Sequence, residues 1–170
     1  VRLGVYECPV PYHRLLSPEL LGWVASTGRF VFTKDTCTHL PTILEKLEAI
    51  KDSGLGFYNA HTATLLASLR AGGSGYSGTA ANVFPKLLVW LCEKYATYPR
   101  EAESLQNLLS VADSYVGHQY PSSAKERIRM QGVAMETASR KNHVTYAWRD
   151  RYVMEQSIAL FEEIAQRLPK

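Results

Sequence analysis

The sequence is poor in cysteine, has no long apolar run, and is not dominated by either sign of charge. Its three cysteines, Cys8, Cys37 and Cys92, form no CxxC pair and no Cys/His metal spacing, so we expect free thiols in a reducing compartment. No apolar stretch approaches the roughly 20 residues that a membrane helix needs, and no signal segment is visible. These absences favour a cytoplasmic protein with no membrane partner.

Charge is mixed along the whole chain. The 19 basic and 16 acidic side chains give a formal net charge of +3. The densest basic stretch contains Lys125, Arg127 and Arg129, but it also carries Glu126. Because nucleic-acid sites combine basic stripes with interleaved aromatic residues, this mixture predicts a solvated helix face instead. We therefore expect no nucleic-acid partner.

Short apolar runs alternate with helical patterns in the first part of the chain. With 46% apolar residues over 170 positions, the chain is long enough for one globular domain with a core. Strands are predicted at 2–6, 30–33, 54–58 and 75–78, and helices start at Pro18 and span 38–50, 61–70 and 82–95. This alternation indicates an α/β fold of four βα units around a parallel sheet.

The later part of the chain shows no strand pattern. Helices are predicted at 101–116, 121–130 and 149–168, with an irregular polar segment at 132–143. We therefore divide the single domain into βα units at 1–97 and a helical extension at 98–170. Four parallel strands with helices on one side make half of a barrel. The closed eight-stranded form needs about 250 residues, so the sheet is open or its other half is absent.

Polar side chains gather at the predicted carboxyl ends of the strands, where βα folds bind ligands. Tyr6 closes the first strand and Lys34 follows the second, while Asn59, His61 and the segment 77–82 (SGTAAN) follow the third and fourth. A lysine amine among apolar groups is partly desolvated, which disfavours its charged form and favours Schiff-base formation with a carbonyl. A neighbouring tyrosine hydroxyl can transfer the protons that this chemistry requires.

Position alone leaves a structural alternative open. Lys34 could extend to the surface and pair with Asp35 or Glu7, and Tyr6 could be a buried tyrosine with a satisfied hydroxyl. The histidines lack a second His, Cys or acid at ligand spacing, so surface or helix-start positions are expected for them rather than zinc ligation. No metal is expected.

Four motifs occur in an order and spacing that one known family shares. They are YECP at 6–9, similar to Y-N-x-P, FTKDT with Lys34 about 28 residues after Tyr6, GGSGYSGTAANVFP at 72–85, and YPSSAK at 120–125. Together they resemble the dihydrodipicolinate synthase and N-acetylneuraminate lyase family of pyruvate-dependent class I aldolases. The resemblance implies the C-terminal half of a (β/α)8 barrel, strands 5 to 8, followed by the family's helical C-terminal region.

The resemblance also implies roles for individual residues. Lys34 would form an imine with pyruvate or another 2-oxo acid, without an external cofactor, and Tyr6 would relay protons while an aldehyde is joined or released. Ser77 and Gly78 would lie beside the pyruvoyl group, and Asn82 would cap the following helix. Further substrate-binding candidates are Asn59, His61 and Arg14, with His13 as the alternative to Arg14.

Departures from the family pattern narrow the expected function. Glu7 stands where asparagine is usual, and the segment 58–63 (YNAHTA) lacks both acids of the sialate lyase motif, so sialic acid is not the expected substrate. The resemblance implies that the first four βα units lie outside this chain and that the protein is a homodimer or homotetramer. The alternative is a non-catalytic family member, or an inactive fragment, that binds a 2-oxo acid or serves assembly only.

Overall fold

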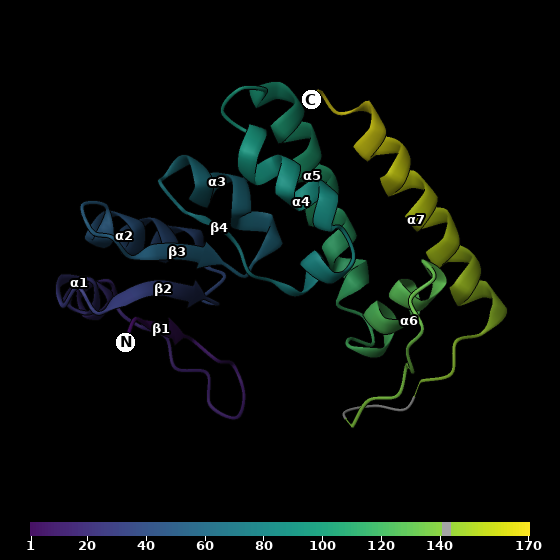
Figure 1. Cartoon of the computed structure of the whole chain (residues 1–170), viewed down its shortest axis with the longest axis horizontal. Coiled ribbons are helices and arrows are strands. Elements are labelled where there is room, and N and C mark those ends of the chain that lie inside the picture. Colours follow the sequence, from purple (N-terminus) through teal and green to yellow (C-terminus); the bar gives the residue numbers. More distant parts are fainter. Residues whose placement is uncertain (141–143) are drawn as a thin grey trace.

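Strands and helices alternate as predicted in the structure, a computed structural model that describes residues 1–140 and 144–170 without the side chain of Val116. The elements are β1 Leu3–Tyr6, α1 Pro18–Ser26, β2 Phe30–Asp35, α2 Leu40–Ile50, β3 Gly56–Asn59, the 3-10 helix η1 Thr62–Thr64, α3 Leu65–Arg70, β4 Gly75–Tyr76, the 3-10 helix η2 Thr79–Asn82, α4 Pro85–Lys94, α5 Pro99–Val116, α6 Ser122–Met130 and α7 Trp148–Arg167. The α/β class is therefore confirmed (Figure 1).

The four strands form one parallel sheet in the order β1-β2-β3-β4. One register row runs Tyr6, Lys34, Tyr58 and Gly75 across the sheet. Because successive strand residues point to opposite faces, the next positions along the strands belong to the other face. The two faces of this sheet have different chemistry.

Two hydrophobic clusters hold the elements together. The first lies between the sheet and helices α1 and α2, and its largest fully buried members include Leu21, Ile43 and Phe57. The second joins α3, α4, α5 and α6, with Leu65, Leu91 and Leu109 at 0% exposure. Burial of each such side chain contributes about 1.5–3 kcal/mol, so the sheet and the helical region each have a core.

The strands differ in length from the prediction. β2 runs two residues further than expected, so Lys34 lies within the strand and not after it. β3 begins at Gly56 rather than residue 54, and β4 ends at Tyr76, which leaves Ser77 and Gly78 in the following loop. The parallel pairing of β2 with β3 continues to Asp35 and Asn59, and this pairing extends the strand through polar residues.

The helix starts also differ. The predicted helix at 61–70 is divided into η1 and α3, and α4 begins only at Pro85, with Phe84 as its N-cap residue. The capping role expected for Asn82 is therefore wrong. Asn82 lies within η2, three residues before α4, where its amide Nδ2 donates to the carbonyl oxygen of Thr79 at 3.1 Å.

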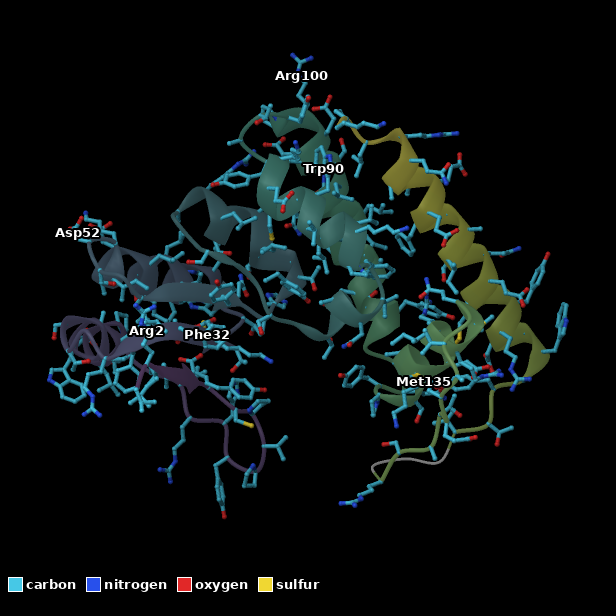
Figure 2. All side chains as sticks on the ribbon, viewed as in Figure 1. Arg2, Phe32, Asp52, Trp90, Arg100 and Met135 are labelled. Carbon is cyan, nitrogen blue, oxygen red and sulfur yellow. The ribbon has the colours of Figure 1, made fainter. Side chains whose placement is uncertain are left out.

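The helical region contains no strand among the residues that the structure describes. Its last helix, α7, lies across the outer side of α4 and α6 (Figure 1). Trp90, labelled in Figure 2, donates from its indole Nε1 to the carbonyl oxygen of Pro169 at 2.6 Å, which fixes the end of this segment. The irregular segment predicted at 132–143 is observed through residue 140, and 141–143, with His143, lie outside the described residues.

The expected solvated helix face on α6 is wrong in part. Glu126 and Arg127 are only 1% and 2% exposed, because α7 covers this side of α6. Glu126 accepts from Arg129 on its own helix and from Arg151 on α7. Within the described ranges, no helix is both apolar enough and long enough to cross a membrane.

Candidate active site

Lys34 and Tyr6 lie side by side on the face of the sheet that helices α1 and α2 do not cover. The Lys34 Nζ atom is 4.4 Å from the centroid of the Tyr6 ring. On the other side of Lys34 in the same register row is Tyr58, whose ring stacks on Phe32 at 4.9 Å between centroids. Figure 2 shows Phe32 within the sheet. Aromatic side chains from three neighbouring strands therefore lie on this face, next to Lys34 in the sheet.

The alternative in which Lys34 pairs with Asp35 or Glu7 is wrong. Both carboxylates lie on the opposite face of the sheet, where they are 1% and 3% exposed and bind the ammonium group of Lys46 from α2. No carboxylate of residues 1–140 or 144–170 lies within ion-pair distance of Lys34. The alternation of side chains in β1 and β2 separates the amine from the acids that follow Tyr6 and Lys34 in sequence.

Lys46 is fully buried and joins the ends of two strands. Its Nζ donates to Glu7 Oε1 at 2.5 Å and to Asp35 Oδ2 at 2.6 Å. Burial alone would lower the pKa of Lys46, but the hydrogen bonds and charges of Asp35 and Glu7 outweigh it and raise that pKa above its usual value. The charged form is therefore stabilised in the core, and Lys46 holds together the residues that follow Tyr6 and Lys34.

Further hydrogen bonds fix the loops that leave these two strands. Glu7 accepts from the backbone N–H of Leu16 at 2.8 Å and from that of Thr36 at 3.0 Å. The Thr36 hydroxyl donates to the Glu7 carbonyl oxygen at 2.6 Å and lies 2.8 Å from Nε2 of His13. These bonds limit the freedom of the backbone that follows Tyr6 and Lys34.

Tyr6 keeps its proton over a wide pH range. Its side chain is 47% exposed, and partial burial together with the adjacent Cys8 raises the pKa of its hydroxyl. A neutral phenol can donate a hydrogen bond or a proton to a reacting oxygen. The contact between the two side chains joins the Lys34 Nζ atom to the face of the Tyr6 ring.

Asn59 and His61, which the sequence placed in the substrate site, are linked to each other. Asn59 is fully buried on the helix side of the sheet, and its Nδ2 donates to hydroxyl oxygens of Thr64 and Ser68. Its Oδ1 accepts from the backbone N–H of His61 at 2.7 Å. These contacts give Asn59 a positioning role for the half-buried His61 at the carboxyl end of β3.

Ser77 and Gly78 follow β4 at the same rim. The Ser77 N–H donates to the carbonyl oxygen of Asn59 at 2.8 Å, which continues the sheet pairing by one bond. A Cβ atom at Gly78 would lie 2.2 Å from the Tyr76 hydroxyl and 2.4 Å from the Ala60 carbonyl oxygen, so only glycine fits there. The backbone after β4 is therefore held close to the end of β3.

Arg14 lies exposed on the loop between β1 and α1, whereas His13 is held against Thr36. Both are alternatives for binding a second substrate carboxylate, and His13 lies with its Nε2 2.8 Å from the Thr36 hydroxyl, directly after β2. No group of three or more His, Cys, Asp or Glu side chains that could hold a metal ion occurs in the part of the chain that the structure describes.

Sequence reasoning missed Lys46 and Tyr58. Lys46 lies between Ile43 and Ile50 on the apolar stripe of α2, and a lysine within such a stripe indicates a buried partner of opposite charge. Tyr58 begins the segment YNAHTA, but its place beside Lys34 depends on strand register, which the sequence leaves open.

A parallel sheet with a lysine and a tyrosine side by side on its open face, and ordered loops at its carboxyl rim, defines an α/β protein of βα units with a candidate amine nucleophile. A family model described as the dihydrodipicolinate synthetase family matches residues 3–158. The chain belongs to this family. The comparison with curated proteins found no match.

Solved structures of that family share the fold. A dihydrodipicolinate synthase from Thermotoga maritima has a TM-score of 0.80 at 18% identity, and a putative one from Thermus thermophilus has 0.76 at 22%. A prophage protein of the family from Escherichia coli, solved in complex with pyruvate, has 0.79 at 16%. In all three cases the match covers 95% of this chain and 56% of the other chain, so this chain spans little more than half their length.

Proposed function

We propose that this chain supplies the imine-forming half of a pyruvate-dependent aldolase or lyase, with Lys34 as the nucleophile. The observation that carries the proposal is the position of the Lys34 amine: 4.4 Å from the Tyr6 ring centroid, on the open face of the sheet, and apart from both buried carboxylates. An amine without an acid partner is the form of lysine that can act as a nucleophile after losing its proton.

The proposed reaction begins with attack of the Lys34 nitrogen on the C2 carbonyl of pyruvate or a related 2-oxo acid. Loss of water, with Tyr6 donating a proton to the departing oxygen, gives the imine. Removal of a proton from C3 gives an enamine, whose C3 bonds to the carbonyl carbon of an aldehyde, or the reverse step releases the aldehyde. Hydrolysis then returns the free amine, so no external cofactor takes part.

The loops at the rim would bind the rest of the substrate. The backbone at Ser77 and Gly78 lies close to the end of β3, where it could contact the pyruvoyl group. His61 and either His13 or Arg14 would face the second substrate. Asn59 would act through His61, because its amide already binds that backbone and two hydroxyl groups.

The proposal includes a second half of the barrel that lies outside this chain. Strands β1 and β4 are at the edges of the sheet, the solved relatives are nearly twice as long as this chain, and open edges normally need cover. We propose that residues 1–97 are strands 5 to 8 of a (β/α)8 barrel and that residues 98–170 are its helical extension. The remaining strands, and a homodimer or homotetramer in the cytoplasm, would complete the working protein.

Reductive trapping tests the nucleophile. The protein that carries this chain is incubated with pyruvate and borohydride, and its mass is then measured. We expect a stable adduct on Lys34, loss of the adduct in Lys34→Ala, and an unchanged adduct in the control Lys86→Ala, which alters an exposed lysine of α4. Equal trapping by Lys34→Ala and the unsubstituted protein would exclude this function. Binding of a 2-oxo acid without any adduct would instead favour the non-catalytic alternative.

A further inference from the structure

A buried arginine in the helical region lacks a partner for one of its nitrogens. Arg127 of α6 is 2% exposed. Its Nη1 donates to the hydroxyl oxygen of Ser157 on α7 at 2.7 Å, and its guanidinium carbon lies 5.2 Å from the ring centroid of Tyr115 on α5. Its Nη2 is buried and has no hydrogen-bond partner in the described part of the chain.

The positive charge of Arg127 lies against the Tyr115 ring but has no carboxylate partner among the described residues. The neighbouring Glu126 binds Arg129 at 2.7 Å and Arg151 at 2.9 Å, and no described carboxylate lies within 4.0 Å of Arg127. Burial lowers the pKa of Arg127, which reflects the loss of hydration. An uncompensated buried charge costs several kcal/mol, so the arrangement favours a bound anion.

A second unpaired group faces the same space. The hydroxyl oxygen of Tyr146 is buried and has no hydrogen-bond partner among the described residues. Tyr146 and Arg127 line one cavity of about 70 Å³ between α5, α6 and the start of α7, together with His118, Gln119 and Asp150. One water needs only about 10–15 Å³ of such space. The cavity therefore has room for a small ion.

The wall of the cavity restricts the kind of ion. Arg127 and Tyr146, whose Nη2 and hydroxyl have no partner among the described residues, both line the space. A planar carboxylate can accept from a guanidinium and a phenol at once. Asp150 also lines the cavity, and its Oδ2 accepts from the backbone N–H of Ala147 at 3.1 Å. Its negative charge opposes any anion, and it opposes a doubly charged ion such as phosphate more than a singly charged one. We propose that this cavity binds a small monocarboxylate anion, at a site separate from Lys34 and independent of the function proposed above.

The experiment measures thermal unfolding of the whole protein against acetate concentration, with chloride keeping the ionic strength constant. We expect acetate to raise the unfolding midpoint more than chloride does, because a ligand of the native state stabilises it. Arg127→Met keeps the aliphatic stem but removes the donors. We expect it to raise the dissociation constant for acetate by about 10- to 100-fold.

Two further variants keep the test decisive. Tyr146→Phe removes one hydroxyl and should weaken acetate binding by about 2- to 10-fold, which gives a readout even if Arg127→Met folds poorly. Arg149→Met removes an exposed arginine charge from α7 and should leave acetate binding unchanged. The proposal fails if acetate and chloride act alike, if the acetate effect persists in Arg127→Met, or if inorganic phosphate stabilises more strongly than acetate.

Discussion

The two faces of the sheet each hold one lysine, and the two lysines have opposite surroundings. Lys34 on the open face is half-buried among aromatic rings and has no acid partner among the described residues. Lys46 on the helix face is fully buried and bound by two carboxylates. Those carboxylates belong to Glu7 and Asp35, which directly follow Tyr6 and Lys34 in the sequence.

The difference shows how one pair of strands can serve two purposes. A lysine with two carboxylate partners is held in its charged form and cannot attack a carbonyl, whereas Lys34 has no such ion pair among the described residues. Because side chains alternate along a strand, the acids that would pair with Lys34 are directed away from it. On the helix face they hold the backbone of the candidate nucleophile in place.

Removal of the buried amine should have the largest effect on stability. Lys46→Met would leave two carboxylates buried without a counter-charge, so we expect the free energy of unfolding to fall by about 3–5 kcal/mol. Denaturant unfolding of the whole protein measures it. The control Lys51→Met breaks an exposed pair with Glu48 and should change little. A loss in Lys46→Met no greater than in this control would mean that the buried pair does not hold the strands.

Neutralising the acids should restore most of that loss. In Lys46→Met we would add Glu7→Gln and Asp35→Asn, which keep the side-chain shapes but remove both charges. We expect stability within about 1–2 kcal/mol of the unsubstituted protein, since what remains is the loss of individual hydrogen bonds. Denaturant unfolding compares the single and triple variants. If the triple variant is no more stable than Lys46→Met, unpaired charge is not the cause of the loss.

The pH dependence should follow the raised pKa of Lys46. A cation whose pKa is higher in the folded state contributes stability below its unfolded pKa of about 10.4, and that contribution is lost as pH rises through the folded value. The stability difference between the unsubstituted protein and Lys46→Met should therefore be constant from about pH 7 to 9 and shrink above about pH 10.5. Denaturant unfolding across this range measures it. A decline already below pH 9 would show that burial dominates and lowers the pKa instead.

The open face should show the smallest effect on stability and a large effect on rate. Tyr6→Phe removes one hydroxyl from a 47% exposed side chain, so we expect a stability change within about 0.5 kcal/mol. The rate of pyruvate trapping should fall by about 10²- to 10⁴-fold, because the proton donor is lost. Tyr12→Phe, on an exposed loop tyrosine, is the control for both measurements. A stability loss well above that range with an unchanged rate would make Tyr6 a structural residue.

Much of the fold follows from local patterns in the sequence. The structure confirms two short-range signals, the amphipathic spacing in α2 and the Ser17 cap before Pro18. The Ser17 hydroxyl accepts from the Leu20 N–H at 3.2 Å. The ends of β2 and β4 were predicted less well, because sheet pairing with neighbouring strands decides where a strand stops. Burial of Glu126 and Arg127 depends on α7, which is far away in the sequence.

The candidate site shows the same difference between local signals and long-range contacts. The sequence identifies Lys34 and Tyr6 as strand-end residues, and the structure brings them to one face, but their catalytic roles remain predictions. The sequence does not reveal that Lys46 binds both Glu7 and Asp35, because these acids precede it by 39 and 11 positions in the chain. Long-range contacts of this kind depend on register and on the direction in which each helix crosses the sheet.

The positions of Lys34 and Asp35 on opposite faces of β2 also bear on the fidelity of folding. A strand that slipped by one residue would exchange its two faces. Lys34 would then meet the ammonium group of Lys46 in the core, and Asp35 would lie among Tyr6 and Tyr58 with no cation beside it. Such a misregistered sheet would bury two ammonium groups beside a single carboxylate, that of Glu7. The residues that divide the two faces therefore also select the correct alignment of the strands while the chain folds.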